Sequence, residues 1–188
     1  MVIRLINSLL TLPLVCLFWI HVIPLSLFLL GYLSFSPDRK LWAYLFAFLI
    51  ILHGILSLAL AVQKQILPRK RYLRENKNFL LQSAAGILIL ALIALHAVSF
   101  GYTTPQGAYI LRDLCITTYL MQILLTLAIG IHCMISIPNL CITLGLITQE
   151  HHQRIARIAA AAITLPPVIL SLIAFTGYYL PALTGGVW

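Results

Sequence analysis

LWAYLFAFLIILHGILSLALAV occupies residues 41–62, an apolar run that contains one histidine, His53, and no charged residue. A run of about 20 apolar residues can cross the hydrocarbon core of a bilayer as a helix. The same pattern recurs along the chain, which has 188 residues, of which 62% are hydrophobic and only 9% charged. Its mean hydropathy is +1.04. The sequence therefore predicts an all-α integral membrane protein, because lipid offers no partner to unpaired backbone groups.

The apolar runs divide the chain into five expected transmembrane helices, within a single domain that spans residues 1–188. Their bounds are about 8–32, 41–62, 79–100, 114–147 and 156–180. The fourth run exceeds the length that a bilayer core requires at about 1.5 Å per residue, so one end should project or the helix should tilt. The fifth contains Pro166 and Pro167, and the backbone bonds lost there must be covered by a neighbouring helix. Little chain remains for a soluble domain, so soluble catalytic machinery is expected on another polypeptide.

The basic residues are divided unequally between the two expected sides of the membrane. One side has Arg4, Lys64, Arg69, Lys70, Arg71, Arg74, Lys77, Arg154 and Arg157, and the other has Arg39, Lys40 and Arg112. The side richer in Lys and Arg faces the cytoplasm by the positive-inside rule, which places the N-terminus inside and Trp188 outside. For the basic cluster between two spans we expect anionic lipid or a protein partner, and no nucleic acid.

Four histidines lie one each in the first four runs: His21, His53, His96 and His132. Ionisable side chains within a membrane indicate a functional site, because lipid leaves their nitrogens without partners. Counting about 1.5 Å per residue from the charged flanks places His21 and His96 in the outer half and His53 and His132 in the inner half. One pair at each level is what two stacked haems b with two axial imidazoles each require of a four-helix bundle. We therefore expect the first four helices to form such a bundle.

Other residues invite a plainer interpretation. The intramembrane histidines have an alternative role in a haem-free network of interhelical hydrogen bonds. His151 and His152 fall in the polar loop 148–153 and are interpreted as solvated. The cysteines lack metal-site spacing and are interpreted as small packing residues, not as zinc ligands or disulfides; they are Cys16, Cys115, Cys133 and Cys141.

Several motifs accompany the histidines between residues 50 and 159. They are His53-Gly54, the stretch Arg71-Tyr72-Leu73-Arg74-Glu75-Asn76, Gln82, Gly86 and His96, then His132, Thr143-Leu144-Gly145-Leu146 and Gln153-Arg154. In these residues the chain resembles the dihaem cytochrome b membrane anchor of succinate dehydrogenases and fumarate reductases, of the type with one five-helix subunit. The resemblance implies that His53 and His132 bind the iron of the haem near an iron–sulfur subunit, and that His21 and His96 bind the iron of the distal haem.

The resemblance also implies the partners of the chain. A flavoprotein that oxidises succinate and an iron–sulfur subunit are expected on the cytoplasmic side, and a membrane quinone, menaquinone or ubiquinone, is the expected substrate. This chain would position the cofactors and contain no residues for succinate chemistry. The haem subunit of another membrane oxidoreductase, such as formate dehydrogenase or a cytochrome b561-like protein, is the main rival. It is expected to lack the Gln82/Gly86 and Thr143/Gly145 context.

Two positions depart from the pattern of this family. The arginine that usually follows the glutamine is Ser83 here, and the Ser or Thr expected before Gly86 is Ala85. A polar partner for a haem propionate is therefore absent from these positions. We hypothesise that Arg74 supplies the cation for the inner haem.

Asp38 is a candidate for the quinone site. It is one of only four acidic residues and stands at the expected outer start of the second span. A carboxyl group there is suited to exchanging a proton with a quinone ring. The alternative is that Asp38 caps the helix or pairs with Arg39 and Lys40.

Overall fold

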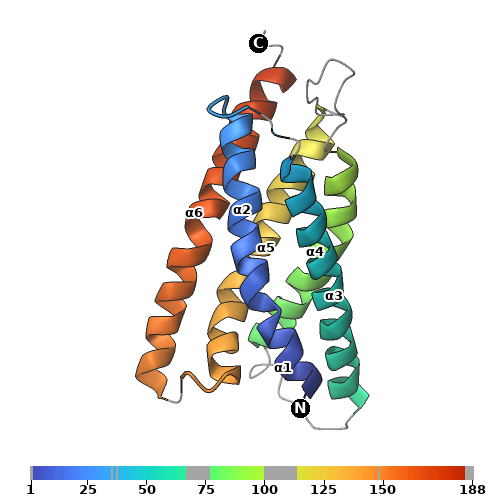
Figure 1. Cartoon of the computed structure of the whole chain (residues 1–188). Coiled ribbons are helices and arrows are strands. Elements are labelled where there is room, and N and C mark those ends of the chain that lie inside the picture. Colours follow the sequence, from blue (N-terminus) through green and yellow to red (C-terminus); the bar gives the residue numbers. More distant parts are fainter. Residues whose placement is uncertain are drawn as a thin grey trace.

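The computed structural model describes residues 2–34, 36, 38–66, 77–99, 114–147 and 149–184. Its helices are α1 (Val2–Leu9), α2 (Thr11–Leu29), α3 (Asp38–Ile66), α4 (Lys77–Ser99), α5 (Ile116–Thr143) and α6 (Glu150–Leu183), shown in Figure 1. Five segments are long and apolar enough to span a membrane: Ile3–Leu29, Arg39–Val62, Lys77–Ser99, Ile116–Thr143 and Glu150–Pro181. The prediction of an all-α, multi-pass membrane protein with five spans is confirmed.

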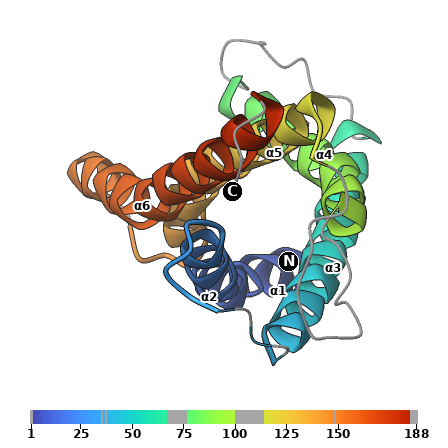
Figure 2. The same ribbon diagram turned by 90° about the horizontal axis from the view of Figure 1, so that it is seen from above.

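The helices stand side by side around a central axis (Figure 2). Neighbours in the chain are mostly neighbours in space, since α2 packs against α3, α3 against α4, α4 against α5, and α5 against α6. The last helix also packs against α2. The fifth span therefore closes the ring between the first span and the fourth, a place that its sequence does not reveal.

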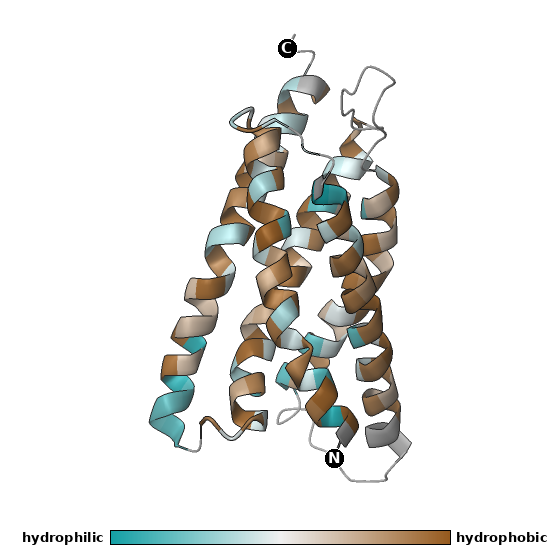
Figure 3. Ribbon diagram, viewed as in Figure 1, coloured by the Kyte–Doolittle hydropathy of each residue, from teal (hydrophilic) through white to brown (hydrophobic). Residues whose placement is uncertain are grey.

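Hydropathy follows the helices along their length (Figure 3). Apolar residues cover most of every helix, whereas hydrophilic residues gather where α6 begins and, at the opposite end of the bundle, where α3 begins. This distribution is the one expected of helices whose middles face hydrocarbon and whose ends face water.

The first span is interrupted near its beginning. It starts at Ile3 rather than at residue 8, and its helix breaks at Leu10 between α1 and α2. Pro13 accounts for the break, because a proline has no N–H to bond the carbonyl four residues earlier and its ring crowds that carbonyl. The next amide along, that of Leu14, bonds the Leu10 carbonyl at 3.3 Å, and the helix continues.

Two glycines end helices earlier than the apolar runs predict. Gly31 and Gly145 take the left-handed conformation, with φ of 79° and 72°. After Gly145, the amide of Leu146 bonds the carbonyl of Cys141 at 2.9 Å, which is the pattern of a Schellman cap. The first and fourth helices therefore end at Leu29 and Thr143, not at 32 and 147.

The long helix α6 continues through Pro166 and Pro167. Pro167 cannot bond the carbonyl of Ile163, which lies one turn earlier. The indole Nε1–H of Trp19, on α2, donates to that carbonyl at 3.1 Å. A neighbouring helix thus covers one of the two backbone bonds that the prolines remove, as the sequence requires.

Replacing Trp19 by phenylalanine is expected to lower the free energy of unfolding by about 0.5–1.5 kcal/mol, because the Ile163 carbonyl loses its donor where lipid offers none. The measurement is unfolding in mixed micelles by increasing fractions of denaturing detergent. Pro167→Ala is the matched background, since an alanine at this position has an amide that can bond the Ile163 carbonyl itself. An equal loss of stability from Trp19→Phe in both backgrounds would contradict this role.

Candidate functional site

The intramembrane histidines meet in two pairs, each across two helices. His21 of α2 faces His96 of α4, with ring centroids 6.2 Å apart and ring planes inclined at 68°. His53 of α3 faces His132 of α5, with centroids 6.3 Å apart and planes at 88°. All four side chains are half-buried. These are the partners that the sequence assigned by depth, and their role as ligands stays a prediction.

A backbone carbonyl orients His132. Its Nδ1 lies 3.1 Å from the carbonyl oxygen of Gln82 on α4. Because a carbonyl only accepts, Nδ1 donates its proton and Nε2 carries the ring's lone pair. A histidine that binds a metal commonly donates its other ring N–H to such an acceptor, which sets the tautomer and the ring orientation.

The side chain of Gln82 fastens α4 to α5 at the same level. Its Nε2 donates to Ser136 Oγ at 2.8 Å, and its Oε1 accepts from Asn139 Nδ2 at 3.1 Å. Gln82 therefore positions His132 in two ways. Its backbone carbonyl orients the imidazole ring, and its side-chain amide binds α5, the helix that carries His132. This residue belongs to the motif pattern, but the sequence does not reveal these contacts.

Gly86 lets α4 approach the imidazole of His132. A Cβ at this position would lie 3.3 Å from His132 Cε1 and 3.5 Å from Nδ1. Such contacts leave no room for a larger side chain unless the ring moves. Gly86 is therefore part of the wall of the His53/His132 pair.

A buried glutamine orients His96. The Oε1 of Gln122, on α5, lies 2.7 Å from His96 Nδ1, and Gln122 has 0% of its surface exposed. With Nδ1 donating to this oxygen, Nε2 carries the lone pair of the His96 ring. An amide inside an apolar run signals an interaction within the membrane. Its sequence position does not tell which histidine it meets, so Gln122 was not predicted as a site residue.

A cavity of about 490 Å³ surrounds the His21/His96 pair. Its walls come from five helices and are mostly apolar, with aromatic rings such as Phe18, Phe46 and Phe175. The ring of Phe46 lies 5.6 Å from that of His21. A largely apolar cavity with a few convergent polar groups is typical of a ligand site.

The two pairs lie at different depths. Gln122, which contacts His96, precedes His132 by ten residues on α5. On α4, Gly86 beside His132 also precedes His96 by ten residues. Ten residues of helix rise about 15 Å, so both helices give the same axial separation of the pairs.

Each histidine pair supplies two imidazoles as candidate metal ligands. Among the described residues, no group of three or more His, Cys, Asp or Glu side chains is placed to hold a metal ion. A bare ion such as zinc takes three or four protein ligands. Neither pair of imidazoles alone supplies that number of protein ligands.

The other predicted residues have varied outcomes. Arg74 lies outside the described residues. Asp38 is the first residue of α3, and its side chain is not among those that the structure describes. His151 and His152 are exposed as predicted, but they belong to the first turn of α6 and not to a loop. The four cysteines form no disulfide.

Comparison of the chain with protein-family models, with curated proteins and with solved structures found no match. The resemblance to the dihaem anchors therefore rests on the motif residues alone.

Proposed function

We propose that this chain is the membrane anchor and dihaem cytochrome b subunit of a succinate:quinone oxidoreductase, passing electrons between an iron–sulfur subunit and a membrane quinone. The observation that carries the proposal is that the four histidines form two pairs at two levels. The ring centroids are 6.2 Å apart in one pair and 6.3 Å apart in the other. The resemblance in the motifs around His53, His96 and His132 connects such a cytochrome to succinate oxidation.

The histidine pairs fit axial ligation of haem iron. Two imidazoles that bind one first-row metal from opposite sides at about 2 Å have ring centroids roughly 6 Å apart. A porphyrin fills the other four positions, so two protein ligands suffice.

The residues of the chain have separate tasks in this proposal. His53 and His132 hold the proximal haem, and His21 and His96 hold the distal one. Gln82 and Gln122 hold the rings of His132 and His96 in a fixed orientation and accept their Nδ1 protons, which leaves the lone pair on Nε2. Bound between these side chains, haem supplies one-electron redox chemistry.

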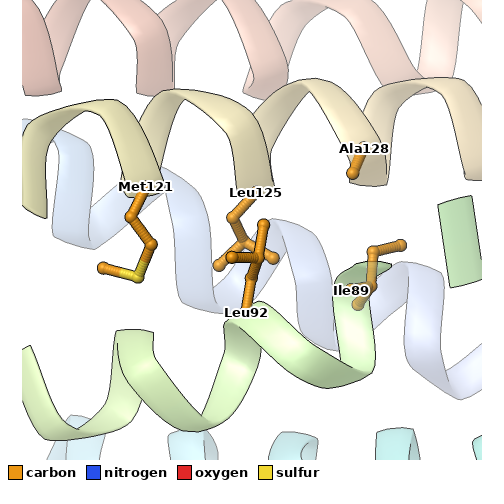
Figure 4. Close-up of a cluster of buried hydrophobic side chains, with 5 residues drawn as sticks. All are labelled: Ile89, Leu92, Met121, Leu125 and Ala128. Atoms are coloured by element: carbon orange, nitrogen blue, oxygen red, sulfur yellow. The ribbon is translucent and has the colours of Figure 1, made fainter. Parts of the chain in front are cut away.

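An apolar cluster packs between α4 and α5 (Figure 4). It consists of Ile89, Leu92, Met121, Leu125 and Ala128. Close packing of these side chains sets the spacing of the two helices that carry His96 and His132. It thereby contributes to a constant separation of the proposed haems, on which the rate of electron transfer depends.

The partners are proposed from the charge at the ends of the bundle. The helices that carry Arg4, Arg154 and Arg157 begin at the same end, the lower one in Figure 1. That end faces the cytoplasm by the positive-inside rule and is the docking side for the iron–sulfur and flavoprotein subunits. Arg74 remains the proposed propionate partner of the proximal haem, and Asp38 remains the proposed proton-exchanging residue at a menaquinone or ubiquinone site.

The first test is a count of haem b in the purified chain by its pyridine haemochrome spectrum. We expect about two haems per polypeptide. A protein without haem would overturn the proposal and favour the haem-free hydrogen-bond network.

The second test reduces those haems in the assembled complex with succinate. Reduction that is blocked when the succinate site is inhibited supports the proposed complex. Haems that accept electrons from formate or another donor, and none from succinate, would assign the chain to a different membrane oxidoreductase.

A further inference from the structure

Two cations stand at the end of the cavity that surrounds the His21/His96 pair. Arg39 and Lys40, both in the first turn of α3, line this cavity together with the two histidines. The remainder of the wall is largely apolar. Positive charge beside an apolar cavity is costly unless an anion accompanies it.

Arg39 has a guanidinium nitrogen without a visible partner. Its Nη1 is buried and makes no hydrogen bond to any residue that the structure describes. Among the acidic residues, Glu150 is the one whose side chain the structure describes. It begins α6 at the opposite end of the bundle (Figure 1). A guanidinium favours a carboxylate, which it can bind through two parallel N–H donors.

The position of Arg39 matches an anionic group on the proposed macrocycle. Phe46, whose ring contacts that of His21, is seven residues further along α3. Arg39 therefore lies about 10 Å along the helix axis from the level of the imidazoles. A propionate at the edge of a porphyrin has a reach of this order from the central metal.

We propose that Arg39, assisted by Lys40, binds the propionate carboxylates of the haem held by His21 and His96. The inference rests on the proposed function and deepens it. With haem bound, Arg39 and Lys40 would hold its carboxylates at the end of the bundle where α3 begins. Arg39 is a positioning residue that sets the orientation and the potential of this haem.

The test compares Arg39→Gln with Arg39→Lys, and with Arg4→Gln as a control that removes one cation at the other end of the bundle. The readouts are the midpoint potential and the occupancy of the haem that is lost in His96→Ala. A cation near haem stabilises the reduced state, which has one more negative charge. We expect Arg39→Gln to lower this potential or the occupancy, Arg39→Lys to restore most of it, and Arg4→Gln to leave both at the wild-type values.

Retention of the other haem shows that the bundle of a variant is folded. If Arg39→Gln loses both haems, Lys40→Gln is measured in its place. A lowered potential of the distal haem in Lys40→Gln supports the inference, and an unchanged potential overturns it. Two haems in the wild type together with wild-type distal potential and occupancy in Arg39→Gln overturn this inference alone. A wild-type chain without haem overturns the proposed function instead.

Discussion

His53→Ala is expected to reduce the number of six-coordinate, low-spin haems per chain from two to one. The His53 ring faces His132 at a centroid distance of 6.3 Å, and alanine removes one of the two axial nitrogens at that level. The pair formed by His21 and His96 lies about 15 Å away along the helices and keeps its ligands. The remaining haem should therefore retain its spectrum and potential.

The matched control for this substitution is His151→Ala. His151 is exposed at the start of α6 and contacts only its neighbour His152 among the aromatic rings described. The substitution His151→Ala removes an imidazole that belongs to neither histidine pair. Low-temperature absorption and electron paramagnetic resonance spectra separate the two haem environments. Two low-spin haems in His53→Ala would show that His53 is not a ligand.

Gly86→Val is expected to disrupt the same haem without removing a ligand. A Cβ at Gly86 alone would lie 3.3 Å from the His132 ring, and two further methyl groups have no space unless that ring moves. The displaced imidazole loses its bond to the Gln82 carbonyl and its alignment with His53. We expect occupancy of the proximal haem to fall several-fold, with a smaller fall in Gly86→Ala.

Gly177→Ala controls for the change in helix propensity. A Cβ there meets only Leu30 Cδ2, at 3.5 Å, which is ordinary van der Waals contact. It should leave both haems bound. The measurement is haem content together with the low-spin spectrum of each variant. Full proximal occupancy in Gly86→Val would mean that the close approach of α4 to His132 is unimportant for binding.

The depth of each histidine could be calculated from the sequence because helix rise is constant. Counting from Arg4, Lys40, Lys77 and Arg112 places each histidine at a level, and the structure brings together the residues of equal level. The ends of the helices were harder to predict from the sequence. Hydropathy does not distinguish an apolar residue inside a helix from one just beyond it, and the positive φ of Gly31 and Gly145 decides where the helices end.

The groups around each histidine could not be identified in this way. Gln122 and Arg39 are visible as polar residues in or beside apolar runs, but the partner of Gln122 and most of the cavity that Arg39 lines belong to other helices. The rotation of one helix about its axis relative to the next decides whether Gln122 meets His96. That rotation results from packing along the full length of several helices, including α6, and no short motif encodes it.

The sequence by itself determined that the chain is all-α, that five segments can span a membrane, and which histidines share a depth, because these properties depend on local composition and on the fixed rise of a helix. The tertiary structure alone decided that α6 closes the ring, that Trp19 bonds the Ile163 carbonyl across 144 positions, and that Arg39 lines the cavity of His21 and His96. These features join residues far apart in the chain, so they exist only once the helices have packed.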